Sequence, residues 1–421
     1  MSSPVDGPFE HGEDGLRAGS VALSKVAARF GTPCYVYVRS AIEQRFRAYQ
    51  QALGSPADVC FAVKANGNLA ILQLLDRLGG GFDIVSGGEL SRVCRAGGDP
   101  ARIVFSGVGK TAAELRDALQ AGIRCFNVES VAELDELAAI AREQGRRAPI
   151  ALRVNPDVDP RTHPYIATGL AESKFGIPMA EAEALYERAA ADPWLEPRGI
   201  ACHIGSQLQD VGPLREAAER IAELYHRLED AGVAIHHVDL GGGLGVRYTD
   251  ETPPTPEEHV AAVTAPFAGT AARVLVEPGR AVVAEAGALL TRVTRLKRNG
   301  ARELAVVDAG MNDYIRPALY GAAPAIEPVQ PPAPGDATAQ DVVGPVCESA
   351  DTFASQRPLG ARPGDLLAIL ATGAYGFAMS SQYNARPRPP EILVDGAEMH
   401  CVRRREDDAD LIQGESLLPE A

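Results

Sequence analysis

Short apolar runs alternate with longer segments of helical spacing from residue 59 onward. Aliphatic runs of about four to eight residues between polar positions are typical of buried strands. Eight such runs precede residue 280, and we predict strands at 59–63, 82–85, 102–105, 123–127, 149–154, 199–203, 235–240 and 273–276. Strands that alternate with helices in this number predict an α/β fold of the (β/α)8 TIM-barrel type.

The segments between these strands carry signals for helix starts. In 111–122, Thr111 and Glu114 stand at the spacing of a capping box, in which each side chain bonds the backbone of the other residue. Ser130 and Glu133 repeat this spacing before the next apolar helical pattern. We therefore predict helices that cover the outside of the barrel.

The pattern changes after residue 281, where longer aliphatic strands joined by Gly and Pro turns replace the helical periodicity. This texture predicts a second, all-β domain of the β-barrel or sandwich kind. The Pro-rich segment 324–340 is predicted to be an exposed loop. In the first 40 residues one good strand occurs, "CYVYV" at 34–38, and we expect it to pair with the β domain. The expected divisions are an N-terminal segment 1–40 packed on the β domain, a cofactor-binding barrel 41–285, and the β domain 286–421.

Composition and charge narrow the function. The chain has 421 residues, too many for one ordinary core, and a formal net charge of −15. A negative surface repels phosphate backbones and anionic lipids, which argues against nucleic-acid and membrane partners. The seven cysteines are scattered without a C-x-x-C pair, and the N-terminus lacks the pattern of a signal peptide. We expect a cytoplasmic protein that binds a small molecule.

The stretch "CFAVKANGN" places Lys64 at the end of an apolar strand. An unpaired buried ammonium is costly, so such a lysine either reaches water with its amine or loses its charge. In the second case it is a candidate Schiff-base nucleophile, which attacks an aldehyde. These nine residues alone leave both interpretations open.

Active sites of TIM barrels form where the carboxyl ends of the strands meet. Five predicted strands end in chemically capable groups, namely Lys64, Ser86, His203, "GGGLG" at 241–245 and "EPGR" at 277–280. Glycine amides in the GGGLG turn allow close approach to a phosphate, although such a turn is also an ordinary tight connection.

Glu277 and His203 complete this set. A carboxylate keeps a pyridine nitrogen protonated and makes the ring an electron sink, whereas an isolated EPGR reads as Glu277 paired with Arg280. His203 is either a satisfied strand histidine or a residue stacked on a cofactor, and no partner at metal-ligand spacing supports a metal. Ser206 is placed to donate to the phosphate. Together with Lys64, these groups predict pyridoxal 5'-phosphate as cofactor.

With these residues assembled, the sequence resembles the pyridoxal-phosphate enzymes of the alanine-racemase fold and, among them, the diaminopimelate decarboxylases. The resemblance extends over about residues 25 to 400. It rests on the ordered motifs "FAVKAN", "FDIVSGGEL", "ESKFGI", "CHIGSQ", "DLGGGLG", "VEPGR", "VDAGMNDYIRPALY", "VVGPVCESADTFA" and "GAYGFAMSSQYNARPRPPEILV".

The resemblance implies decarboxylation of meso-2,6-diaminopimelate to L-lysine and CO2, the last step of lysine biosynthesis. It also implies a homodimer in which "CES" at 347–349 reaches into the partner's site. Its catalytic residues would be Lys64, Cys347 and His203. Its cofactor contacts would be Lys64, His203, Ser206, Gly242, Gly243, Glu277, Pro278, Gly279, Arg280 and Tyr375. Its substrate contacts would be Arg280, Arg316, Tyr320, Glu348 and Tyr375.

The chemistry of the proposed substrate-contacting residues agrees with a substrate that has an amino group and a carboxylate at each end. Arg316 matches a distal carboxylate bidentately, and Glu348 matches a distal ammonium. Ornithine or arginine would leave Arg316 unpaired, at a cost of ~2–4 kcal/mol in discrimination. Cys347 reads either as a small buried apolar residue or as the acid that protonates the carbanion, and the adjacent carboxylate favours the protonated thiol that an acid needs.

Three alternatives stay open at this point. One is a decarboxylase of the same fold acting on ornithine, arginine, carboxynorspermidine or a carrier-linked amino acid, although ornithine-type enzymes resemble "CD" rather than "CE" at 347–348. Where the family pattern has a histidine shortly after "RPALY", this chain reads "GAAPAIEPV", which keeps a related substrate open. The others are a racemase, disfavoured by the strong electron sink that Glu277 makes, and a non-catalytic homologue that binds the cofactor, disfavoured by the presence of Lys64 and Cys347.

Overall fold

The computed structural model describes residues 7–160, 174–332 and 338–419. The chain divides into two compact units. The barrel unit comprises the described parts of Glu43–Val246 and Glu251–Val282. The β unit comprises those of Met1–Ile42, Arg247–Asp250 and Val283–Ala421.

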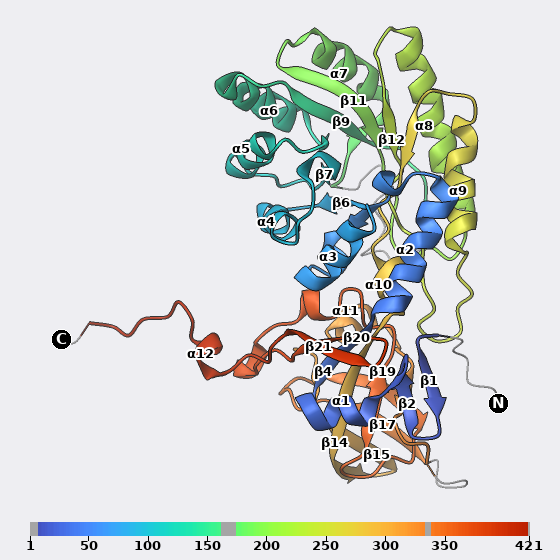
Figure 1. The fold of residues 1–421 in the computed structure, drawn as a ribbon, viewed down its shortest axis with the longest axis vertical. Coiled ribbons are helices and arrows are strands. Elements are labelled where there is room, and N and C mark those ends of the chain that lie inside the picture. The colour runs from blue at the N-terminus through green and yellow to red at the C-terminus, as the bar shows by residue number, and fades with distance from the viewer. Residues whose placement is uncertain (1–6, 161–173, 333–337, 420–421) are drawn as a thin grey trace. The chain divides into compact units, whose positions relative to one another are not determined.

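The barrel unit is built on parallel strands that follow one another around the sheet (Figure 1). In order they are β5 (Cys60–Ala62), β6 (Gly81–Ile84), β7 (Ile103–Phe105), β8 (Cys125–Val128), β9 (Ala148–Asn155), β11 (Leu195–Ala201), β12 (His237–Asp239) and β13 (Arg273–Leu275). A bridge between Val59 and Val276 joins the two ends, with the Cys60 N–H donating to the Val276 carbonyl at 2.8 Å. Each predicted strand overlaps one of these, so the barrel is confirmed.

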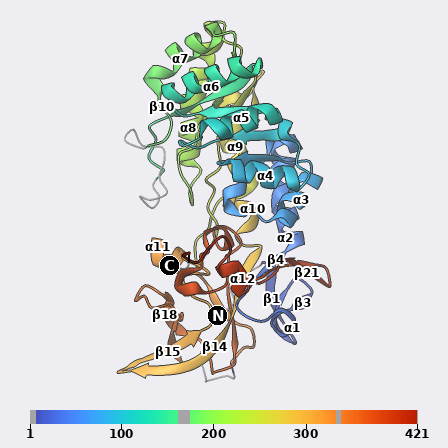
Figure 2. The ribbon, with the colours of Figure 1, turned by 90° about the vertical axis from the view of Figure 1, so that its left-hand side faces the viewer.

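Helices cover the outside of this sheet (Figure 2). They are α2 (Arg39–Leu53), α3 (Leu69–Arg77), α4 (Gly87–Arg95), α5 (Ala112–Ala121), α6 (Val131–Gln144), α7 (Met179–Ala191), α8 (Gly212–Asp230) and α9 (Pro256–Thr264), and the short strand β10 (Ile177–Pro178) pairs with β9. Inside the barrel, side chains from six strands form a small apolar cluster of Cys60, Val104, Cys125, Ala151, Ala201 and Leu275. At these positions the interior of the barrel is therefore a packed core.

Two helix starts were predicted from capping boxes, and one of them is complete. Thr111 and Glu114 bond each other's backbone at the start of α5. At α6, Ser130 accepts the Glu133 N–H, but the Glu133 carboxylate accepts from Lys110 Nζ and the Glu129 N–H. The buried ammonium of Lys110 needs a carboxylate partner, and Glu133 is that partner. Its side chain therefore does not bond the backbone of Ser130, and the capping box stays incomplete.

The β unit contains a large mixed sheet in the order β18-β17-β15-β14-β4-β20-β21, to which β19 and β16 are added. Its strands are β4 (Cys34–Val38), β14 (Gly287–Asn299), β15 (Arg302–Val307), β16 (Ile326–Pro328), β17 (Ala339–Val343), β18 (Thr352–Pro358), β19 (Leu366–Ile369), β20 (Glu391–Asp395) and β21 (Glu398–Arg403). Strand β4 lies between β14, antiparallel to it, and β20, parallel to it. The short helices of this unit are α1 (Leu23–Phe30), α11 (Arg316–Tyr320) and α12 (Asp408–Leu411), whereas α10 (Arg280–Val283) belongs to the barrel unit except for its last residue.

Two expectations for this unit are wrong in part. Before residue 34 the chain also forms a small sheet of β1 (Phe9–Gly12), β2 (Gly15–Ala18) and β3 (Val21–Ala22), strands too short for a sequence pattern. The Pro-rich segment 324–340, of which 333–337 lie outside the described residues, is not one exposed loop, because β16 pairs with β19 and Val329 is fully buried. Its prolines are compatible with a strand at the sheet edge, where no partner needs their missing N–H.

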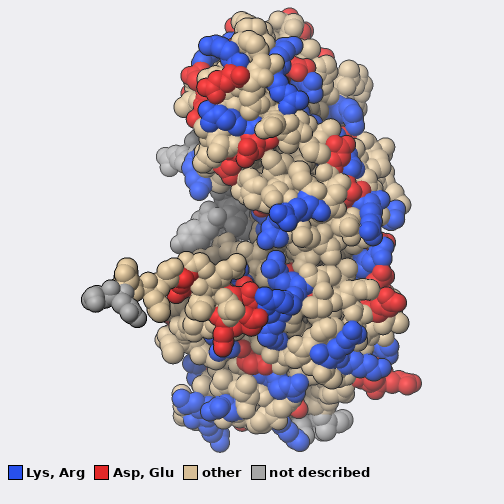
Figure 3. Space-filling model, turned by 60° about the vertical axis from the view of Figure 1, so that its left-hand side comes forward, with Lys and Arg blue, Asp and Glu red and all other residues tan. Residues whose placement is uncertain are grey.

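Acidic and basic side chains are mixed over the face drawn in Figure 3. The short basic run near the C-terminus is internally balanced, since Arg403 pairs with Glu391, and Arg404 pairs with Asp407 and Asp410. Among the described residues, no helix has the length and apolar character needed to cross a membrane.

Candidate active site

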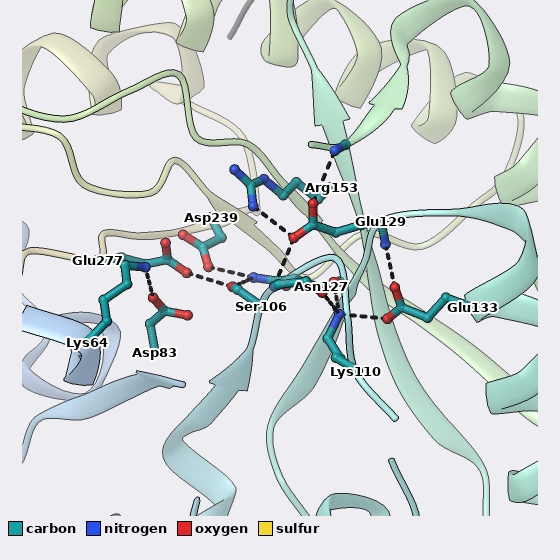
Figure 4. Close-up of polar contacts among 12 residues, drawn as sticks. Lys64, Asp83, Ser106, Lys110, Asn127, Glu129, Glu133, Arg153, Asp239 and Glu277 are labelled. Carbon is teal, nitrogen blue, oxygen red and sulfur yellow. Dashed lines mark hydrogen bonds and ion pairs between the residues drawn. The ribbon is translucent and has the colours of Figure 1, made fainter. Parts of the chain in front are cut away.

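Lys64 lies in a short turn directly after β5, and its Nζ donates to Asp83 Oδ2 on β6 at 2.7 Å (Figure 4). The Asp83 side chain is completely buried, whereas 36% of the Lys64 side chain is exposed. The second oxygen of Asp83 is buried and has no hydrogen-bond partner among the described residues. A buried carboxylate needs a cation, so this contact holds the Lys64 amine at the mouth of the barrel.

The glycine turn after β12 has no room for side chains. Gly241 and Gly243 have φ values of +67° and +109°, which disfavour residues with a Cβ. A Cβ on Gly242 would lie 2.3 Å from the Glu277 carbonyl, and one on Gly243 would lie 2.6 Å from the Gly205 carbonyl. The turn therefore presents bare backbone, as a phosphate site requires.

His203 lies against this turn and is uncharged. The Gly242 N–H donates to His203 Nδ1 at 3.3 Å, so that nitrogen is unprotonated. Burial, with the positive charges of Arg153 and Lys64, lowers the pKa of His203 well below its usual value. In the same unit, Arg280 donates to Ser206 Oγ at 3.0 Å. A neutral imidazole ring is suited to stack on another flat ring.

Glu277 follows β13 and is nearly completely buried. Its N–H donates to the Gly241 carbonyl at 2.7 Å, and Ser106 Oγ donates to its Oε1 at 3.5 Å. Burial and the negative charges of Asp239 and Asp83 raise the pKa of Glu277 well above its ordinary value. The folded state therefore favours the protonated form of Glu277.

The sequence interpretation missed a polar network that lies around these residues (Figure 4). Glu129 accepts from the Gly107 N–H and Arg153 Nη1, both at 2.8 Å, and from the Gly176 N–H at 3.1 Å. Lys110 Nζ donates to Glu133 Oε1 at 2.6 Å. Other missed residues lie within the strands, namely Asp83, Asn127 and Asp239, and Ser106 directly follows β7. The signal was a polar residue inside an otherwise apolar parallel strand, where both faces are buried.

In the β unit, the Arg316 guanidinium lies among three aromatic rings. Its Cζ is 5.4 Å from the ring centroid of Tyr248, 4.9 Å from that of Tyr320 and 5.9 Å from that of Tyr375. Arg316 is 5% exposed, and its Nε is buried without a hydrogen-bond partner among the described residues. A desolvated guanidinium of this kind is prepared to receive an anion. Tyr248 was not predicted.

Cys347 and Glu348 lie on an exposed loop of the same unit, so Cys347 is not a buried apolar residue. The Cys347 N–H donates to Asn384 Oδ1 at 3.2 Å, and Tyr383 Oη donates to Glu348 Oε1 at 2.8 Å. The buried carboxylate of Asp351 anchors the loop by accepting the Val346 N–H at 2.7 Å.

The predicted residues therefore fall into two sets. The barrel unit holds Lys64, His203, Ser206, Gly242, Gly243, Glu277, Pro278, Gly279 and Arg280. The β unit holds Arg316, Tyr320, Cys347, Glu348 and Tyr375. In the part of the chain that the structure describes, no group of three or more His, Cys, Asp or Glu side chains is arranged to hold a metal ion.

Comparison with known proteins first defines the class. Residues 39–284 match the family of the pyridoxal-dependent decarboxylases through its pyridoxal binding domain. The chain is 55% identical over 415 residues to diaminopimelate decarboxylase from Pseudomonas aeruginosa, which covers 98% of this chain and 99% of the relative. It is 50% identical to the enzyme of the same name from Vibrio cholerae, again over 98% and 99% of the two chains.

Solved structures agree. Diaminopimelate decarboxylase from Helicobacter pylori complexed with L-lysine is 42% identical, with a TM-score of 0.89 over 92% of this chain and 98% of that one. The enzyme from M. jannaschii in complex with L-lysine is 36% identical, with a TM-score of 0.92 over 98% of both chains. The chain belongs to the diaminopimelate decarboxylase family. The predictions of the family, the fold class and the pyridoxal-phosphate cofactor are confirmed.

Proposed function

We propose that the protein catalyses the pyridoxal-phosphate-dependent decarboxylation of meso-2,6-diaminopimelate to L-lysine and CO2. The substrate assignment rests on Arg316, whose buried guanidinium has an Nε without a partner among the described residues. It offers two parallel donors to a distal carboxylate. Relatives with L-lysine bound support an amino-acid ligand of this kind.

The residues of the barrel unit fit the cofactor. Lys64 supplies the amine that would hold it covalently, and the bare backbone of Gly242 and Gly243 suits its phosphate, assisted by Ser206 and Arg280. Gly279 belongs to the same surface, because a Cβ there would come within 3.0 Å of the Ala62 and Ala65 methyl groups. When bound, pyridoxal phosphate provides the electron sink that accepts the charge left on the α-carbon as CO2 departs.

Side chains of the barrel unit determine where protons are held and donated during the reaction. Burial and neighbouring negative charge favour a proton on Glu277, which would give it to a basic ring nitrogen. Neutral His203 offers a flat ring that adds no positive charge beside that nitrogen. The Lys64 ammonium is paired with Asp83, and it must lose a proton and this contact before it reacts, because only the free amine attacks a carbonyl carbon.

The second set of groups would recognise the distal end and finish the reaction. Arg316 would bind the distal carboxylate and Glu348 the distal ammonium, while Cys347 would donate a proton to the α-carbon. Because Cys347 and Glu348 stand on an exposed, well-anchored loop, we propose that this loop completes the site of a second copy in a homodimer. The seven free thiols suit a reducing compartment, and we propose the cytoplasm.

The test is CO2 release from a panel of meso-diaminopimelate, L-ornithine, L-arginine, carboxynorspermidine and a carrier-bound glutamate. We expect release from meso-diaminopimelate, together with formation of L-lysine. Lys64→Ala is the control, and it should lose both turnover and the visible absorbance of bound cofactor. If meso-diaminopimelate is inert and another compound releases CO2, the substrate proposal is wrong although the reaction class stands.

A further inference from the structure

Four polar side chains form a buried layer in the mouth of the barrel, one each from the carboxyl-terminal ends of four strands (Figure 4). Asn127 Nδ2 donates to Ser106 Oγ at 3.1 Å and to Asp239 Oδ2 at 3.3 Å. Ser106 Oγ donates in turn to Glu277 Oε1 at 3.5 Å. The Gly241 N–H donates to Asp239 Oδ1 at 3.0 Å. The layer joins a residue that sequence predicted, Glu277, to three that it did not.

The layer contains two carboxyl groups within hydrogen-bond reach of each other, Asp239 and Glu277, which we call the carboxyl pair (Figure 4). Asp239 is 1% exposed and Glu277 is 7% exposed. Two buried carboxylates in contact repel each other, so one of them must hold a proton and donate it to the other. Asp239 receives two N–H donors, from Asn127 and Gly241, whereas Glu277 receives one long contact from Ser106. Asp239 is therefore the anion and Glu277 the acid.

The other ionisable groups near the carboxyl pair do not change this assignment. Lys64 and Asp83 both act on Glu277, and their charges largely cancel because they form an ion pair at 2.7 Å. The thiols of Cys60 and Cys202 are neutral, since burial raises the pKa of each. The charge that remains beside Glu277 is that of Asp239.

We propose that Asp239 is a positioning residue that shares one proton with Glu277, so that the carboxyl pair, held in place by Asn127 and Ser106, sets the protonation of the cofactor's ring nitrogen. The proposal rests on the proposed function for the identity of the cofactor. With the cofactor bound, Glu277 Oε would give its proton to the ring nitrogen. Glu277 and Asp239 would then present two negative charges to that one cation, and would favour its protonation more strongly than Glu277 alone.

The test is Asp239→Asn in the holoenzyme, read first from the pH dependence of the visible absorbance of bound cofactor without substrate. Loss of a negative charge in contact lowers the pKa of neighbouring cations, so we expect the absorbance midpoint to fall by about one pH unit. The weaker electron sink should lower kcat about tenfold, with KM for meso-diaminopimelate within about twofold. A residue with only a structural role would not move the absorbance midpoint.

A second variant and a matched control keep the result interpretable. Asn127→Ala removes a donor that keeps Asp239 ionised, and its midpoint should fall in the same direction by a smaller amount. Asp341→Asn removes a buried carboxylate of the β unit, paired with Arg302, and should leave the midpoint unchanged. If Asp239→Asn does not fold, Asn127→Ala decides alone.

Each outcome has one meaning. Midpoints of Asp239→Asn and Asn127→Ala within about 0.2 pH units of the wild-type value would overturn the proposal, as would an equal shift in Asp341→Asn. A wild-type protein that stays colourless with added pyridoxal phosphate would instead overturn the proposed function. Activity on another amino acid, with the midpoint shifts intact, would change the substrate and leave the role of Asp239 standing.

Discussion

At the scale of single residues, the aromatic surroundings of Arg316 determine how well it can bind a carboxylate. The Arg316 guanidinium lies over the face of the Tyr248 ring, with its Cζ 5.4 Å from the ring centroid. A desolvated cation–π contact is worth about 1–2 kcal/mol, which corresponds to a factor of roughly 5–30 in binding. We expect Tyr248→Leu to raise KM for meso-diaminopimelate by this factor while kcat changes little, as measured by steady-state CO2 release.

Tyr248→Phe is the matched control, because it keeps the ring and removes only the hydroxyl. Its KM should stay within about twofold of the wild-type value. A Phe variant as weak as the Leu variant would show that the ring face is not what matters. Arg316→Ala should impair substrate binding far more and still retain the cofactor absorbance.

Residues at the carboxyl ends of the strands could be predicted as site residues, because a barrel brings these ends together whatever the sequence between the strands. Lys64, His203 and Glu277 could be predicted once eight parallel strands were counted. Asp83 and Asp239 could not, because a carboxylate inside an apolar strand has a role only when its neighbours across the sheet are known. Asp83 is bonded by Lys64, 19 residues earlier in the chain, and Asp239 by Asn127, 112 residues earlier, so neither partner can be recognised from the strand itself.

At the scale of elements, a buried side chain helps to anchor the loop that carries Cys347. Asp351 accepts the Met311 and Val346 N–H groups, each at 2.7 Å. Asp351→Ala leaves both donors without a partner and should loosen the loop, lowering kcat about tenfold or more because a small displacement of a catalytic group is costly. The cofactor absorbance should not change.

Asp351→Asn is the milder comparison, since its amide oxygen still accepts one of the two N–H groups, and we expect an intermediate kcat. Equal kcat values for Asp351→Ala and the wild-type enzyme would contradict a positioning role. Parallel loss of cofactor absorbance would point to general misfolding instead.

Helix α4 supplies a pH-dependent term in stability. Burial raises the pKa of Glu89 from 4.5 to about 7, although the Val85 N–H donates to it. The folded state therefore favours the protonated acid, and its stabilising contribution is complete below pH 4.5 and is lost as pH rises through 7. Between about pH 5 and 8 this loss amounts to about 1–3 kcal/mol, and Glu89→Gln should abolish it. Urea unfolding at the two pH values measures the difference.

Glu114 serves as the control for Glu89, since hydrogen bonds from Gly87 and Thr111 lower its pKa. Its stabilising contribution is present above pH 4.5 and is lost only as pH falls further, so Glu114→Gln should destabilise equally at pH 5 and pH 8. An unchanged pH slope in Glu89→Gln would refute the assignment.

The sequence predicted long elements better than short ones for a physical reason. A barrel strand or helix repeats its apolar pattern over several residues, and that repetition identifies it. Strands β1 and β3, and the proline-containing β16, are specified by partners elsewhere in the chain. The incomplete cap at α6 has the same origin, since Glu133 serves the buried Lys110.

At the scale of the whole molecule, the groups proposed for the reaction are divided between the two units. Lys64 belongs to the barrel unit, and Cys347 belongs to an exposed loop of the β unit. If that loop completes the site of a second copy, Lys64→Ala and Cys347→Ala damage different parts of each site. A mixed dimer of the two variants then contains one site with both defects and one site with none.

We therefore expect two nearly inactive proteins to regain activity when they are dissociated and reassociated together. Random pairing makes half of the dimers mixed, and one intact site in each gives about a quarter of the wild-type activity. Each variant treated alone is the control and should stay inactive. No recovery, with mixed dimers demonstrated by mass spectrometry of differently tagged chains, would mean that Lys64 and Cys347 act within one chain. The reaction would then need no contribution from a partner.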